Sequence, residues 1–142
     1  MAIAFVTGGS RGLGLETAKR LKKHGYEIVL FAKNEELLKE VSPNLQANFE
    51  VVDLENTEQT RKVFTQAVEK YGTPEILMLA HGVMSEKMSK TLRTTDEEWA
   101  RVLNINLNSV FTIINSVGTK MADARKGRII VYSACLGRMS GP

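Results

Sequence analysis

The sequence predicts an α/β protein with a doubly wound parallel sheet in the strand order 3-2-1-4-5. Short apolar runs alternate with longer amphipathic segments along the chain, a pattern typical of parallel strands whose sheet is covered by helices on both faces. A glycine-rich turn at 7–14 joins the first run to the first amphipathic segment. Because crossovers are right-handed, few topologies remain, and ligands of such sheets bind where the winding reverses, at the carboxyl ends of strands 1 and 4.

Each expected element follows from its own residues. The strands are the apolar runs at 3–7, 27–32, 47–52, 75–80 and 128–133. The helices lie between them at 12–24, 34–41, 57–71 and 95–122. Asn34 is suited to cap the second helix, Asn56 or Thr57 to begin the third, and Gly72 to end the third. Thr95 with Glu98 forms a capping box at the start of the long fourth helix.

Composition places the chain in an ordinary class. Its 142 residues, 43% hydrophobic and 25% charged, are sufficient for one domain spanning 1–142. No apolar run approaches the length of a membrane span, so we expect a cytoplasmic protein with no membrane partner. The single Cys135 cannot form an internal disulfide, and no Cys/His cluster has metal-ligand spacing. The net charge of +3 is dispersed among acidic residues, which argues against a nucleic-acid partner.

The glycine turn is the strongest functional signal. It reads Thr7-Gly8-Gly9-Ser10-Arg11-Gly12-Leu13-Gly14. Glycines at a strand-to-helix turn let the backbone approach a diphosphate closely, and the helix N-terminus supplies unpaired N–H groups and a positive dipole end. The turn therefore predicts a nucleotide site near the start of the chain.

Three further motifs follow in order. They are Asp53 after the third strand, residues 99–107 with Asn106 on the fourth helix, and residues 127–131 on the fifth strand. With the Thr-Gly-x-x-x-Gly-x-Gly turn, these motifs make the chain resemble the N-terminal, Rossmann-type part of the short-chain dehydrogenase/reductase family over its whole length. The resemblance implies that the family's C-terminal strands are missing from this chain.

The resemblance also implies the reaction and the site. Family members transfer a hydride between a nicotinamide and the carbon of a small-molecule carbonyl or alcohol. Asn106 and Ser133 fall at or beside catalytic positions of the family. The expected cofactor-binding residues come from the glycine turn and from the ends of strands 2, 3 and 4: Thr7, Gly8, Ser10, Arg11, Gly12, Leu13, Gly14, Lys33, Asp53, Leu54 and Gly82.

Charge favours NADP(H) over NAD(H) as the cofactor. An acidic residue at the end of strand 2 would repel the 2′-phosphate of NADP. Ala32 holds that place, Lys33 follows it, and Arg11 in the glycine turn can reach the same phosphate. Two cations complement a dianion. The alternative is that Arg11 and Lys33 simply face solvent.

The chain departs from the family at the catalytic groups. None of its tyrosines is followed four residues later by lysine, although the family uses Tyr-x-x-x-Lys as its tuned proton donor. The usual serine pair reads Ser133-Ala134, so Ser133 serves only with a one-residue shift. The family's Asn-Asn-Ala-Gly reads Leu79-Ala80-His81-Gly82. His81 could act as an acid/base or as a satisfied structural histidine.

Two functions remain open at this point. The first is an NADP(H)-dependent oxidoreductase whose site is completed by a longer chain or by a second polypeptide. The second is a non-catalytic, truncated NADP(H)-binding module that acts through partner contacts. An exposed fifth strand and the several apolar faces of the long helix predict a homo-oligomer in either case.

Overall fold

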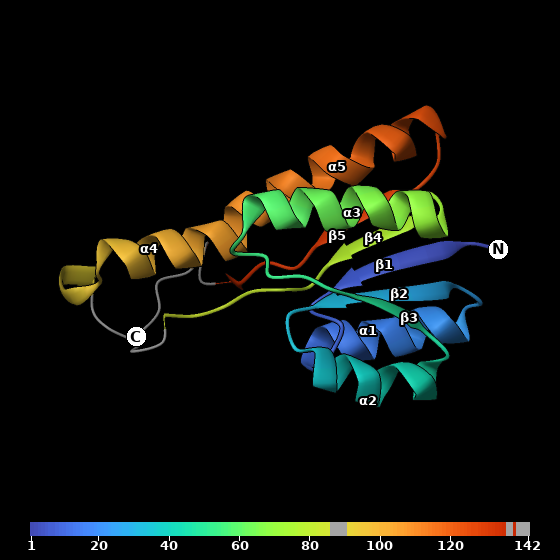
Figure 1. Cartoon of the computed structure of the whole chain (residues 1–142), viewed down its shortest axis with the longest axis horizontal. Helices are drawn as coiled ribbons and strands as arrows, with labels where there is room; N and C mark the ends of the chain where they lie inside the picture. Colours follow the sequence, from blue (N-terminus) through green and yellow to red (C-terminus); the bar gives the residue numbers. More distant parts are fainter. Residues whose placement is uncertain (86–90, 136–137, 139–142) are drawn as a thin grey trace.

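Five parallel strands form one sheet in the order β3-β2-β1-β4-β5 in the computed structural model (Figure 1). The structure describes residues 1–85, 91–135 and 138. The strands are β1 (Ile3–Thr7), β2 (Glu27–Ala32), β3 (Asn48–Val51), β4 (Ile76–Leu79) and β5 (Arg128–Val131). The predicted fold class and strand order are therefore confirmed.

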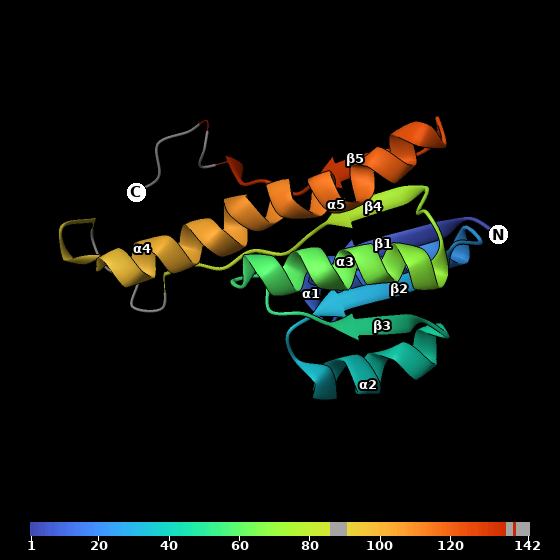
Figure 2. The ribbon, with the colours of Figure 1, turned by 45° about the horizontal axis from the view of Figure 1, so that its top comes forward.

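Helices cover both faces of the sheet (Figures 1 and 2). One face carries α1 (Gly12–Lys23) and α2 (Glu35–Leu45), and the other carries α3 (Thr57–Tyr71) and α5 (Ser109–Asp123). The short helices η1 (Thr91–Arg93) and α4 (Asp96–Leu103) lead into α5 through the π-helical segment η2 (Asn104–Asn108). Within the described ranges, every helix is too short or too polar to cross a lipid bilayer.

Alternation along the strands divides the core in two. Successive side chains of a strand point to opposite faces, so Phe5 packs toward α3 and α5 while Ala4 and Val6 pack toward α1 and α2. Phe31 of β2 stacks on Phe64 of α3 with ring centroids 4.3 Å apart. These buried rings fix α3 on the sheet, because each face can bury its apolar set in only one register.

The predicted helix caps are present. The side-chain oxygens of Asn34, Asn56 and Thr95 accept hydrogen bonds from the N–H groups three residues ahead, at 2.9, 2.9 and 3.2 Å. Each bond satisfies a backbone donor that has no partner within its own helix. Local sequence therefore determines where α2, α3 and α4 begin.

The predicted end of the second helix at residue 41 was too early. Helix α2 continues through Pro43 to Leu45. Leu45 is buried in the core, and Gln46 adopts a left-handed conformation with φ of 46°, from which its N–H bonds back to the carbonyls of Ser42 and Pro43. Tertiary packing of the last turn thus outweighs the hydrogen bond that proline removes.

The predicted long helix at 95–122 forms one helical rod that a π-helical turn interrupts. Its α-helical parts α4 and α5 are separated by the π-helical turn η2, which contains Asn106. A π turn holds one extra residue and rotates the side chains that follow it, and such turns are frequent at functional sites. Figure 1 shows α4 extending past the end of the sheet, while α5 packs beside α3.

We predict that core and surface phenylalanines on the two packed helices differ sharply in their contribution to stability. Phe64→Ala removes a fully buried ring that stacks on Phe31, and should lower the free energy of unfolding by about 3–5 kcal/mol. Phe111→Ala on α5 is the matched control, because that ring is 66% exposed, and should change it by less than about 1 kcal/mol. Urea unfolding measures both, and equal losses would contradict this packing.

Candidate functional site

The glycine turn after β1 is tightly folded. Gly8 and Gly12 have φ of 63° and 55°, in the left-handed region that favours glycine. A Cβ built on Gly14 would lie 2.2 Å from the carbonyl oxygen of Gly8, so α1 begins in direct backbone contact with the turn. Side chains are excluded at this contact, and the first turn of α1 is held against the carboxyl end of β1.

The N-terminus of α1 is open toward a ligand. Arg11 is its N-cap residue but makes no side-chain cap bond, and no acidic residue occupies the first turn. A Cβ on Gly12 would meet nothing within 4 Å. The first N–H groups of a helix have no intrahelical partner, and together with the helix dipole they attract anions.

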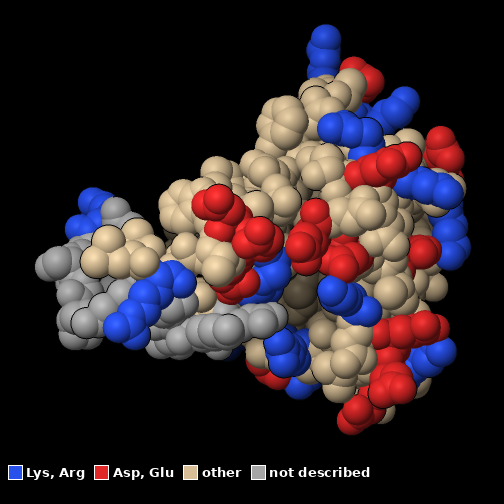
Figure 3. Space-filling model, turned by 60° about the vertical axis from the view of Figure 1, so that its left-hand side comes forward, with Lys and Arg blue, Asp and Glu red and all other residues tan. Residues whose placement is uncertain are grey.

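A pocket of about 450 Å³ lies beside this helix end, at the carboxyl ends of the strands. Figure 3 looks toward that edge of the sheet and shows a hollow bordered by side chains of both charges. The lining residues come from the glycine turn and from the segments that follow β2, β3 and β4, together with Ile105 of η2: Gly8, Ser10, Arg11, Gly12, Leu13, Gly14, Ala32, Lys33, Asn34, Leu37, Val52, Asp53, Leu54, Ala80, His81, Gly82, Val83 and Ile105.

Ten of the eleven predicted cofactor-binding residues line this one pocket. The exception is Thr7, which is buried at the end of β1 and bonds to the ring of His81 behind the pocket wall. Eight further lining residues were not among the predicted site residues: Ala32, Asn34, Leu37, Val52, Ala80, His81, Val83 and Ile105. Asn34 and Leu37 could have been found because they follow strand 2 directly. Ile105 gave no such signal, because only the path of the helical rod brings it to the pocket.

Lys33 and Asp53 form an ion pair at the pocket, with Nζ and Oδ2 2.7 Å apart. Burial raises the pKa of Asp53, but the Lys33 ammonium and the Glu55 N–H outweigh burial and leave this pKa below its usual value. Asp53 in turn raises the pKa of Lys33. The sequence analysis placed the two residues in one site but did not foresee their pairing, which sets a carboxylate beside the cation expected to bind phosphate.

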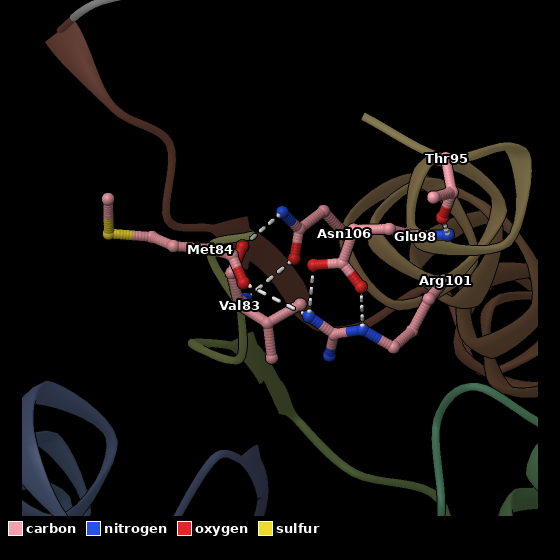
Figure 4. A network of polar contacts seen from close by, with 6 residues as sticks. All are labelled: Val83, Met84, Thr95, Glu98, Arg101 and Asn106. Carbon is pink, nitrogen blue, oxygen red and sulfur yellow. Dashed lines mark hydrogen bonds and ion pairs between the residues drawn. The ribbon is translucent and has the colours of Figure 1, made fainter. Parts of the chain in front are cut away.

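Asn106 clamps the segment after β4 (Figure 4). Its Oδ1 accepts from the Val83 N–H and its Nδ2 donates to the Val83 carbonyl, both at 2.8 Å. Arg101 donates to the Met84 carbonyl at 3.1 Å and to both carboxylate oxygens of Glu98. The predicted catalytic residue Asn106 thus holds one wall of the pocket through a paired backbone contact. It is not itself a lining residue.

Ser133, the other predicted catalytic residue, lies apart from the pocket lining. It is exposed, just beyond the end of β5. Its neighbour Tyr132 continues the pairing with β4 by donating its N–H to the Leu79 carbonyl at 2.9 Å. The Tyr132 hydroxyl lies 2.7 Å from Thr17 Oγ1 on α1. Tyr132 therefore ties the edge strand to α1.

His81 is hydrogen bonded at both ring nitrogens. Nδ1 lies 2.6 Å from Thr7 Oγ1 and Nε2 lies 2.8 Å from Ser109 Oγ. Burial lowers the pKa of His81 to about 4, although the Ile105 carbonyl offsets part of this effect. Of the two interpretations of this histidine, the geometry favours the satisfied structural one.

The parallel sheet, the glycine turn and the pocket at the reversal of winding define a Rossmann-like nucleotide-binding architecture. The family model for short chain dehydrogenases matches residues 2–142. The chain belongs to the short-chain dehydrogenase/reductase family.

Known relatives are distant and longer. The chain is 29% identical over 145 residues to a 3-oxoacyl-acyl-carrier-protein reductase of Chlamydia muridarum, covering 98% of this chain and 58% of the relative. It is 32% identical over 139 residues to the reductase of that name from Escherichia coli, covering 96% and 56%. The chain thus spans a little over half the length of these relatives.

Solved structures agree with the fold. The actinorhodin polyketide ketoreductase with NADPH superposes with a TM-score of 0.90 at 28% identity, covering 99% of this chain and 56% of that one. A metagenomic short-chain oxidoreductase in complex with NADP superposes with a TM-score of 0.89 at 25% identity, covering 94% and 62%. Both similar proteins were therefore solved with a phosphorylated nicotinamide cofactor.

We predict that Gly14→Ala destabilises the protein by at least about 2 kcal/mol, because the new methyl group would overlap the Gly8 carbonyl and push α1 off the turn. Gly82→Ala is the control, since a Cβ there would meet only Asn106 Oδ1 at an ordinary 3.6 Å. Urea unfolding of the two variants compares the losses. A Gly14→Ala variant as stable as Gly82→Ala would contradict the close contact.

His81 also predicts a dependence of stability on pH. Its pKa of about 4 in the folded state lies below the ordinary 6.5, so between these values the unfolded chain binds more protons. The stabilisation is present above pH 6.5 and is lost as the pH falls toward 4, by about 2–3 kcal/mol. Unfolding of the wild type and His81→Asn should therefore show a stability gap that narrows on acidification, whereas a constant gap would exclude this linkage.

Proposed function

We propose that the pocket binds NADP(H), with the diphosphate at the N-terminus of α1. The observation that carries this proposal is the open, glycine-lined helix end, where Gly12 leaves room and no side chain caps the backbone donors. Gly8, Ser10, Leu13 and Gly14 line the same pocket. Asp53 and Leu54 would contact the adenine, and Gly82 would allow the chain after β4 to approach the remainder of the dinucleotide.

Selection of the 2′-phosphate would rest mainly on Arg11. Lys33 lines the same pocket, but its ion pair with Asp53 offsets much of its charge. The pair is easily opened, because an ion pair whose lysine side chain is 72% exposed contributes about 0–1 kcal/mol. A phosphate dianion can therefore draw Lys33 away from Asp53, at a cost that Arg11 does not incur.

We further propose that the protein is an oxidoreductase acting on a small-molecule carbonyl or alcohol. When bound, the cofactor would supply or accept the hydride. Asn106 would keep the segment after β4 in place through Val83. The 142 residues contain no Tyr-x-x-x-Lys, so the family's usual proton donor is not among them.

A second candidate function is a non-catalytic NADP(H)-binding module that acts through association. The observation that favours it is β5, an edge strand whose side chains are all exposed, among them Ile129, Ile130 and Val131. Unpaired edge strands with apolar side chains recruit further chain. We propose that a second copy of the protein covers this edge.

We predict that Arg11→Ala weakens NADPH binding by about tenfold or more while changing NADH binding about twofold or less, because only NADPH carries the 2′-phosphate. Lys33→Ala is the matched variant and should weaken NADPH less than Arg11→Ala, since Asp53 already neutralises Lys33. Fluorescence titration of the wild type and both variants with NADPH and with NADH gives the six affinities. Equal loss of NADPH and NADH on Arg11→Ala would remove the cofactor assignment.

For the proposed association, we expect light scattering to find the wild type as a dimer or larger assembly. Ile130→Lys should dissociate it, because a buried lysine at a paired edge is unfavourable. Leu92→Lys is the control at another exposed apolar position, 97% accessible and distant in sequence from β5, and should leave the assembly intact. A monomeric wild type at high concentration would count against a second copy as the occupant.

A further inference from the structure

His81 joins three elements that the cofactor site depends on. It lies just after β4, and its ring reaches Thr7 at the end of β1 on one side and Ser109 at the start of α5 on the other. Ser109 Oγ in turn donates to the Ile105 carbonyl within η2 at 2.6 Å. A continuous chain of hydrogen bonds therefore runs from the glycine turn to the π-helical segment that contains Asn106.

Only one assignment of donors and acceptors is consistent along this chain of hydrogen bonds. Ser109 has a single hydroxyl proton, which it donates to Ile105, so its oxygen must accept from a proton on His81 Nε2. A neutral ring protonated at Nε2 leaves Nδ1 as an acceptor for the Thr7 hydroxyl. Thr7 Oγ1 itself accepts from the Ala80 N–H at 3.1 Å. The Nε2–H tautomer thus satisfies Thr7, His81 and Ser109 together.

The opposite tautomer breaks this pattern. A proton on Nδ1 would point at Thr7 and would turn the Ser109 hydroxyl toward Nε2, which would remove the hydrogen bond from Ser109 to the Ile105 carbonyl. The Thr7 hydroxyl would then depend on the Met78 carbonyl, at 3.5 Å. A partly buried carbonyl that loses its hydrogen bond costs more free energy than such a bond contributes when it forms.

Backbone packing also links His81 to the glycine turn. A Cβ built on Gly8 would lie 3.1 Å from the His81 Cα and 3.0 Å from the Ala80 carbonyl oxygen. The glycine turn thus rests directly on the backbone that His81 anchors. A shift of His81 toward or away from Ser109 therefore moves the backbone atoms of residues 80 and 81 that Gly8 contacts.

We propose that His81, as the neutral Nε2–H tautomer, is a positioning residue that couples the glycine turn to the π-helical segment η2. It sets the distance between the proposed diphosphate site and the Asn106 clamp. It does not exchange protons with a ligand, because both ring nitrogens are engaged by Thr7 and Ser109. The inference rests on the proposed function only where cofactor affinity is the measurement.

The tautomer can be tested without any cofactor. The protein has two histidines, so long-range proton–nitrogen spectra of the histidine-labelled protein at pH 7 contain two ring systems, and His24→Asn assigns them. We expect His81 to show a protonated Nε2 and an unprotonated Nδ1, with no averaging between tautomers. A protonated Nδ1, a doubly protonated ring or averaged nitrogen shifts would overturn the proposal.

The coupling is tested by Ser109→Ala, with Ser116→Ala as the matched control. Both serines lie on α5 and donate to the carbonyl four residues earlier, at 2.6 and 2.7 Å. Of the two, Ser109 is the one bonded to His81. We expect Ser109→Ala to shift the backbone amide signals of Thr7, Gly8 and Val83, and Ser116→Ala to leave them in place. Shifts confined to the neighbours of residue 109 would overturn the coupling.

Cofactor affinity provides the last measurement. We expect Ser109→Ala to weaken NADPH about three- to tenfold and Ser116→Ala to leave it unchanged. Equal affinities of both variants and the wild type would refute a positioning role. If the wild type itself failed to bind NADPH, the proposed function would fail, while the tautomer and amide shifts would still decide the role of His81.

Discussion

The contact between Gly14 and the Gly8 carbonyl is the constraint on which the site depends. Because no side chain fits between them, the first turn of α1 lies directly on the end of β1. That placement turns the unpaired N–H groups of α1 toward the pocket and puts Gly12 where it leaves open space. The segments after β2, β3 and β4 then complete the walls of a pocket whose position α1 has already fixed.

The opposite wall needs its own support, since the segment after β4 leaves the sheet there. Asn106 holds it through both polar groups of Val83, and His81 holds it through Thr7 and Ser109. Both connections end on the helical rod at or beside η2. The π turn therefore serves as the common anchor of the pocket wall: Ile105 lines the pocket while Asn106 bonds to the backbone of Val83.

Local patterns were sufficient to predict the sheet, because alternating apolar runs, caps and glycines each act over a few residues. They also predicted most of the pocket, since the ends of parallel strands meet at one edge. The pattern could not predict the Lys33–Asp53 pair, whose members come from different strands, or the end of α2 beyond Pro43, which depends on burial of Leu45. The 3.6-residue period of the apolar pattern predicted one continuous helix over 95–122, because such a period does not register one extra residue.

The central place of β1 has a consequence for how the chain is made. Strands β2 and β3 can pair beside β1 as soon as residues 1–51 have left the ribosome, but the other edge of β1 needs β4, residues 76–79. Until then a row of backbone donors and acceptors on β1 stays open, although its side chains belong to the final core. Synthesis therefore passes through a stage in which three of the five strands exist and the central strand is an edge, which exposes the nascent chain to mispairing with other chains.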